Sequence, residues 1–437
     1  MRFPKRIRIG PELRKRLIYT ILLVGLFRGL TLVPVFDVQQ GELDQILAEN
    51  PLLGAIDLFA GGEVIVNFSI VGAGIFPVIL ATLIVNGATW FVPRLRELRE
   101  LGEAGRKRLK IYSRLLTIII AFLIAWIITE LLSAEIGLLP GKIRWLTWAS
   151  LLPSLKIILL FTLGSTLATA ISDLITNKGV YEGEGVLLIV GVFFSFCSRA
   201  VEWVRQWPPP IDSQVGIQAA AGFVAITICL FLVKFIWRVP VQQARQIASS
   251  RRPSSSNYLP FRLVYGGVVP VSAAIGSLAL ARITQEFVEV YILGKGVAGS
   301  TALGGWTAPQ NGWSWLVFAL LITAFTYLSN FALIWGGSAG EGPSLADELK
   351  YRGTFIPGVR PGRRTARYLS KLMLKISAIG SLILCVLAVA LPWLVFYLTG
   401  QDLTVTFLSL FVVIEHLDRF WDHPKADYLQ ESYSSLL

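Results

Sequence analysis

The chain has 437 residues, of which 54% are hydrophobic and only 16% are charged, and its mean hydropathy is +0.63. Soluble domains carry about 25% charged residues, so this composition excludes an ordinary soluble protein and predicts one that crosses a membrane many times. The net charge of +12 does not indicate a nucleic-acid-binding domain, because Lys and Arg lie in blocks between apolar runs.

The amino-terminal end is basic and leads directly into the first apolar run. Seven Lys and Arg residues lie between Arg2 and Arg16. The apolar run that follows is too long for the hydrophobic region of a signal peptide, and no A-x-A cleavage pattern comes after it. We therefore predict a cytoplasmic tail over residues 1–16 rather than a cleaved signal.

The second apolar run, residues 52–91, cannot be one plain helix. It carries no charge between Glu63 and Arg94, so it is longer than the roughly 20 residues that a span needs. The Gly61-Gly62 doublet separates a short apolar piece, 52–60, from the rest. We predict a short half-inserted helix, a break and then a full span. Irregular backbone at membrane depth is tolerated where it is buried in protein or lines a watery path.

Ten apolar runs predict ten membrane spans. The predicted spans are 17–35, the broken 52–91, 115–132, 157–175, 185–204, 217–237, 267–284, 313–335, 372–398 and 405–420. The fifth and tenth are weak, because Arg199 and Glu415 shorten their uncharged cores.

The distribution of basic residues supports all ten. Lys and Arg are frequent after the second, sixth and eighth spans, whereas the connections after the third, fifth and seventh hold one to three each. The positive-inside rule then requires both weak spans and places both termini in the cytoplasm. The predicted organisation is a tail at 1–16, a first half at 17–212, a second half at 213–420 and a tail at 421–437.

A short pattern recurs five spans apart, as GIFP at 74–77 and GVVP at 267–270. With five spans in each half the two halves would be inverted, which is a common way to build a path at the membrane midplane. The predicted fold class is therefore an all-α polytopic membrane protein of ten transmembrane helices in two inverted halves. Two connections, 238–265 and 336–371, are basic and larger than connectors need, which favours partner docking over plain topology signals.

The chemistry is identified mainly by exclusion. The acidic residues Glu130, Asp173 and Glu415 lie near span ends. The one deep charge, Arg28, either neighbours a path, or pairs with a loop carboxylate or snorkels. Neither the three cysteines, Cys197, Cys229 and Cys385, nor any other motif gives a metal site, phosphate loop or catalytic constellation. We predict a passive channel without cofactor or metal. The alternatives are a secondary transporter of small solutes and a lipid-modifying membrane enzyme.

Four stretches of the sequence carry a family resemblance. They are FAGGEVIVNFSIVGAGIFP at 59–77, GEAGRKRLKIYSR at 102–114, YLPFRLVYGGVVP at 258–270 and GTFIPGVRPGRRTARYL at 353–369. ISDLITNKGVYEGEG at 171–185 is a looser match. Through them the chain resembles the SecY family, the channel subunits of the bacterial and plastid protein translocase, over nearly its whole length.

The resemblance implies an hourglass of ten helices that passes unfolded polypeptides through its centre and releases membrane segments sideways. Residues 52–67 would form the plug, with Leu52, Leu53, Ile56, Leu58, Phe59, Gly61 and Gly62. The second and third spans would part from the seventh and eighth as a lateral gate, with Leu80 and Asn86. Leu80 departs from the small polar residue that the family commonly has there.

The resemblance also implies a ring of apolar side chains at the constriction, which would resist wetting by ions and water. Carried over by position, the ring consists of Ile75, Ile79, Val190, Phe194, Ser272 and Leu408, with Ser409 as the alternative in the tenth span. Ser272 departs from the family's usual aliphatic residue. Either the ring is more polar here, or a one-residue slip places Val271 in it.

Partner docking is expected on the two basic loops. The residues implied are Arg251, Arg252, Arg262, Arg360, Arg363 and Arg364. The implied partners are small membrane subunits of the SecE and SecG type, the motor ATPase SecA, the ribosome, unfolded preproteins with their signal sequences, and the bilayer itself. The membrane would be a bacterial plasma membrane or a thylakoid.

Overall fold

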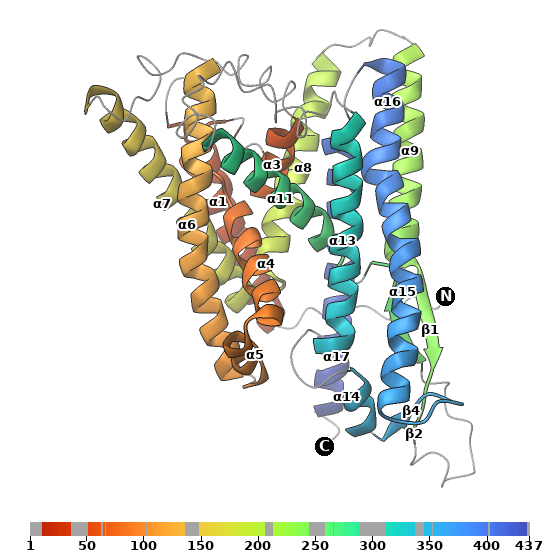
Figure 1. Cartoon of the computed structure of the whole chain (residues 1–437). Helices are drawn as coiled ribbons and strands as arrows, with labels where there is room; N and C mark the ends of the chain where they lie inside the picture. Colours follow the sequence, from red (N-terminus) through yellow and green to blue (C-terminus); the bar gives the residue numbers. More distant parts are fainter. Residues whose placement is uncertain are drawn as a thin grey trace. The chain divides into compact units, whose positions relative to one another are not determined.

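The computed structural model describes residues 11–35, 51–62, 64–65, 67–101, 103–135, 148–205, 213–243, 258–264, 266–287, 312–336, 345–351, 353–400 and 403–434. Within these ranges the chain is almost entirely α-helical, with two small sheets of two strands each (Figure 1). The helices lie where the apolar runs predict them, so the all-α fold class is confirmed.

Each predicted span coincides with a helix or with helical segments in direct succession. In order, they are α1 (Pro11–Thr31), α3 (Pro51–Ala60) with α4 (Phe76–Phe91), α6 (Glu103–Glu135), α7 (Trp148–Lys178), α8 (Gly183–Arg205), α9 (Ser213–Lys234), α11 (Val269–Phe287), α13 (Gly312–Gly336), α15 (Arg363–Cys385) with α16 (Leu391–Thr399), and α17 (Thr404–Ser434). Among the described residues, five helices are long and apolar enough to cross a bilayer, and three shorter segments are apolar.

The described residues form two compact units. The first contains residues up to Ala81, the range 115–210 and the end of the chain from His416, and the second contains 82–114 and 211–415. Helix α4 therefore begins in the first unit and ends in the second. The predicted division between residues 212 and 213 stays a prediction.

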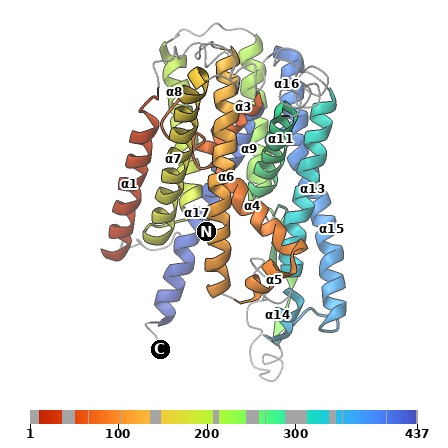
Figure 2. The same ribbon diagram turned by 60° about the vertical axis from the view of Figure 1, so that its left-hand side comes forward.

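In the first unit, α1, α7 and α8 pack together (Figure 2). A polar contact fixes the end of α7 near α1, because Thr20 Oγ1 accepts a hydrogen bond from the Val180 backbone N–H at 3.3 Å. The short helix α3 packs against α8. The first unit thus brings the amino-terminal helix, the short inserted helix and the fifth predicted span into contact.

In the second unit, α13 packs against both α11 and α15, and α9 packs against α16 (Figure 1). Helices α15 and α16 form one rod, joined by a π-helical turn, η3 (Val386–Ala390). Pro392 follows this turn and has no N–H for the Ala388 carbonyl, which explains a local departure from α-helical bonding.

The basic connections hold more regular structure than loops. Helix α15 begins at Arg363, inside the predicted loop and before the predicted start at 372, and α5 (Pro93–Glu100) and α6 fill much of the connection after the second span. The strands β1 (Ile236–Pro240) and β3 (Tyr258–Arg262) pair antiparallel. The strands β2 (Gln242–Gln243) and β4 (Thr354–Phe355) also pair, and so join the two predicted loops.

A buried amide ties three segments of the second unit together. Asn330 of α13 is fully buried, and its Nδ2 donates to the Leu263 carbonyl at 3.3 Å and to Ser377 Oγ of α15 at 2.9 Å. A buried polar group is expensive without such partners, so the amide is a specific stabilising contact.

Replacing Asn330 by Ala is expected to lower the free energy of unfolding by about 1–3 kcal/mol, because buried partners would lose their donor. The measurement is heat unfolding of the purified protein in detergent. Asn86→Ala is the matched control, because the Asn86 side chain is exposed. Equal unfolding midpoints for the two variants would contradict the assignment.

Candidate functional site

The short helix α3 is buried although it is not a span. Its described apolar side chains are almost fully shielded, namely Ala55, Ile56, Leu58, Phe59 and Ala60. The Phe59 and Phe76 rings lie 6.5 Å apart between centroids, so α3 also packs on the start of α4. The side chains of Leu52 and Leu53 lie outside what the structure describes.

The helix ends at two glycines that adopt left-handed backbone conformations. Gly61 has φ 122° and Gly62 has φ 68°, as the predicted break requires. The Gly62 N–H donates to the Asp57 carbonyl at 3.0 Å. On α8, a Cβ added to Gly191 would overlap the Gly61 carbonyl, so the two backbones touch there. Gly191 was not among the predicted site residues, since no local pattern marks a long-range backbone contact.

Arg28 of α1 holds the same turn from another side. Its Nη1 donates to the Gly62 carbonyl at 2.9 Å, and its guanidinium lies 4.4 Å from the centre of the Phe194 ring on α8. The residue is only 8% exposed. A buried charge is costly unless it has such partners. Of the two readings left open by the sequence, the contacts place Arg28 beside the predicted plug and ring residues.

Asp57 fixes the segment that follows α3. Its Oδ1 accepts a hydrogen bond from the Ile65 N–H at 2.6 Å, and the residue is buried. Asp57 is not among the predicted site residues. A single carboxylate within an otherwise apolar ten-residue helix could have indicated it. The carboxylate lies next to backbone donors that would otherwise lack partners in an apolar region.

The irregular backbone between α3 and α4 is packed and hydrogen-bonded. The segment pairs with the end of α1, because Val35 N–H donates to the Phe68 carbonyl at 2.9 Å and Ile70 N–H to the Val33 carbonyl at 3.0 Å. On the α7 side, Ser165 Oγ donates to the Val71 carbonyl at 3.2 Å. Non-helical backbone in an apolar region requires partners of this kind.

The four ring candidates of the first unit lie on α8 and at or just before the start of α4, two segments that contact α3. Ile75 is buried, and its N–H donates to the Ala60 carbonyl at 3.0 Å, so it is joined directly to the end of α3. Ile79 follows one helical turn later and is half-buried. Val190 and Phe194 lie four residues apart on α8, and Phe194 is 44% exposed.

The ring candidates of the second unit are buried. Ser272 on α11 is 2% exposed, and its Oγ donates to the Val269 carbonyl at 3.0 Å, so the hydroxyl is satisfied within its own helix. Val271 is buried as well, and so are Leu408 and Ser409 on α17. Burial therefore does not decide between the alternatives of each pair. The ring as a whole stays a prediction.

The two gate candidates differ in environment. Leu80 is buried, whereas Asn86, on the part of α4 that belongs to the second unit, is exposed. Between α4 and α6, a hydrogen bond joins the hydroxyls of Thr82 and Ser113 at 3.0 Å. The roles of Leu80 and Asn86 in a gate stay predictions.

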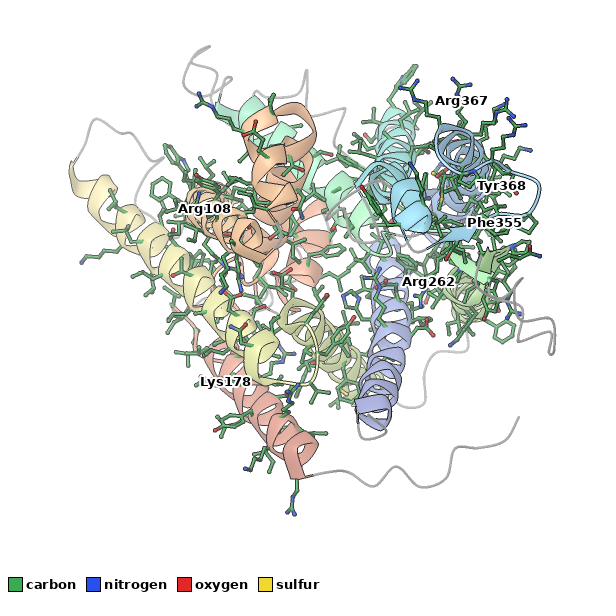
Figure 3. All side chains as sticks on the ribbon, turned by 90° about the horizontal axis from the view of Figure 1, so that it is seen from below. Arg108, Lys178, Arg262, Phe355, Arg367 and Tyr368 are labelled. Carbon is green, nitrogen blue, oxygen red and sulfur yellow. The ribbon has the colours of Figure 1, made fainter. Side chains whose placement is uncertain are left out.

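The described docking candidates lie on or shortly after the paired strands of the second unit. Arg360, Arg363 and Arg364 are exposed, and Arg262 on β3 is half-buried. Figure 3 looks towards the end of the second unit where α15 begins, and shows Arg367 at the outer edge of α15, with Tyr368 and Phe355 of β4 near it. Arg251 and Arg252 lie outside the described residues.

Comparison with known proteins identifies relatives over most of the chain. A SecY family model matches residues 69–417. The protein translocase subunit SecY of Streptomyces scabiei is 28% identical over 390 residues, which cover 86% of either chain.

Two solved structures share the fold. One concerns the SecY plug domain, described as stabilising the closed channel and maintaining a membrane seal; its TM-score is 0.61 at 14% identity, covering 99% of this chain and 96% of that chain. Sec61 in the canine ribosome–channel complex from the endoplasmic reticulum has a TM-score of 0.60 at 14% identity, with the same coverage.

Replacing Arg28 by Ala is expected to loosen the turn after α3, because the buried Gly62 carbonyl loses a charged donor worth about 1–3 kcal/mol. Hydrogen exchange of the amides of Gly62 and Ile65 should accelerate, by about tenfold per 1.4 kcal/mol. Arg14→Ala, at an exposed position of the same helix, is the control. Exchange that stays at the wild-type rate in the Arg28 variant would refute the role.

Proposed function

The chain belongs to the SecY family, the protein-conducting channel subunits of the Sec translocase, and we propose that α3 is the plug that closes this channel. The observation that carries the proposal is the set of contacts that hold the end of α3. The glycine turn after it lies in backbone contact with Gly191 of α8 and accepts a hydrogen bond from Arg28, and its last residue, Ala60, accepts one from the ring candidate Ile75.

These contacts support a plug that can move out of the channel and return. The contacts are concentrated at the Gly61-Gly62 turn, where glycine allows the backbone to rotate at little steric cost. Apart from the hydrogen bond between Asp57 and Ile65, the body of α3 contributes apolar packing, which has no directional requirement. In the proposed open state, α3 swings about this turn and uncovers a constriction formed by the predicted ring residues Ile75, Ile79, Val190, Phe194, Ser272 and Leu408.

The two alternatives from the sequence are less well supported. A secondary transporter of small solutes is not favoured, because the family match extends over most of the chain. The family also fits a channel rather than an enzyme, which leaves the lipid-modifying reading without support. Transport work would then come from a partner and not from chemistry within this chain.

The basic end of the second unit supports partner docking. The exposed arginines lie among regular elements, because β2–β4 pairing joins the two connections and α14 (Leu345–Tyr351) packs against α13, α15 and β4. We propose that Arg360, Arg363, Arg364 and Arg262 bind a motor ATPase of the SecA type or the ribosome, which accompanies Sec61 in the canine complex. Small subunits of the SecE and SecG type complete the proposed assembly, with both termini cytoplasmic.

A valine at Gly191 should displace the plug, because its Cβ would overlap the Gly61 carbonyl. In reconstituted vesicles, the resting ion leak is expected to rise at least about tenfold, the effect of 1.4 kcal/mol against the closed state. Deleting residues 52–60 should act in the same direction. Gly222→Val on α9 is the matched control, because nothing lies within 4 Å of a Cβ at Gly222. A leak equal to the control's would remove the plug assignment.

Charge reversal at Arg360 tests the docking surface. Arg360→Glu is expected to abolish motor-driven preprotein translocation into vesicles, since an acidic side chain would repel the partner group that the arginine pairs with. The protein should still insert and show the wild-type ion leak. Lys178→Glu, an exposed basic residue at the end of α7, serves as the control. Translocation at the wild-type rate would exclude docking through Arg360.

A further inference from the structure

One face of the α15–α16 rod is exposed along its whole length. Exposed side chains recur every three or four residues, and the opposite face is buried. The exposed positions include Arg364, Arg367, Lys371, Lys375, Ile379, Leu382, Val386, Trp393 and Tyr397. An exposed face of this kind is the surface that such a rod presents to its surroundings.

The chemistry of this face changes abruptly along the rod. From Arg364 to Lys375 it is basic, and from Ile379 to Val386 it is apolar. At the far end, Trp393 and Tyr397 stack with their rings 6.0 Å apart. Basic residues at one end of an apolar stretch and aromatic residues at the other are typical of the two boundaries of a membrane span.

The spacing along the rod fits one bilayer. At about 1.5 Å per residue, Lys375 and Tyr397 lie about 33 Å apart, close to the hydrocarbon thickness of about 30 Å. Lys371 then lies about 6 Å outside the hydrocarbon, within the layer of lipid headgroups. Arg364 lies about 16 Å outside it, in the aqueous phase. The basic face therefore divides into a part that meets lipid and a part that meets water.

The rod itself carries no acidic residue that could pair with the two lysines. The sequence contains no Asp or Glu from Tyr351 to Gln401. Within the described ranges, neither Lys371 nor Lys375 forms an ion pair with a carboxylate. Two ammonium groups one turn apart at headgroup depth are complementary to a phosphate, and their aliphatic stems can lie along the apolar face below.

We propose that Lys371 and Lys375 form a binding site for the phosphate of an anionic phospholipid, in the leaflet that the amino-terminal end of α15 enters. The site is separate from the arginines proposed for partner docking, of which Arg363 and Arg364 lie at the start of α15, about two turns before Lys371. The inference rests on membrane placement of α15 and not on channel activity. Its failure would therefore leave the proposed function standing.

The test titrates the full-length, delipidated protein with phosphatidylglycerol and, separately, with phosphatidylcholine, and counts bound lipids by native mass spectrometry. The wild type is expected to prefer phosphatidylglycerol. K371Q/K375Q should bind it about 30-fold more weakly, equivalent to about 2 kcal/mol for two basic groups at a membrane surface. R363Q/R364Q carries the same charge change above the headgroup layer and should keep the wild-type preference.

Two outcomes would overturn the proposal. Unchanged phosphatidylglycerol binding by K371Q/K375Q would exclude the site, and so would equal losses in the two double variants, which would indicate general electrostatics. K371R/K375R keeps both charges and should retain the preference, which separates loss of charge from a folding defect. Lost ribosome or motor binding with intact lipid binding in K371Q/K375Q would assign the lysines to a macromolecular partner instead.

Discussion

The need to satisfy backbone hydrogen bonds away from water governs the first unit. Helix α3 ends inside an apolar stretch, so its last carbonyls and the irregular segment behind it require partners supplied by the protein. Arg28 provides one for Gly62, the end of α1 provides others for residues 68–70, and Ser165 of α7 bonds Val71. The same contacts that make this backbone tolerable also define where the inserted helix can rest.

The sequence predicted those features that local composition determines. Apolar runs identified the helices, and the Gly61-Gly62 doublet identified the end of α3, because glycine is needed where φ is positive. The partners of Arg28 could not be predicted in the same way. One lies on the residue 34 positions away and the other on α8, so that only the tertiary fold decides whether the charge pairs, snorkels or lines a path.

The basic connections show where pattern reading is weakest. The strands β2 and β4 are two residues long and pair across more than a hundred positions of sequence, a separation at which no periodicity is informative. Helix α15 begins at Arg363, earlier than predicted. Its first turns are basic, and the sequence pattern therefore indicates a loop there, although Arg and Lys are good helix formers. Ser272 illustrates a different limit. The resemblance allows either Ser272 or Val271 in the ring, and both residues are buried, so burial does not decide between them.

The π-helical turn η3 sets the rotation of α16 about the axis of the rod. Each residue turns an α-helix by about 100°, and a π turn accommodates one residue more than an α turn does. Without that extra residue, α16 would be rotated by about 100° from its present orientation. The Trp393–Tyr397 pair would then lie on a different side of the rod. The π turn therefore determines which side chains of α16 continue the exposed face of α15.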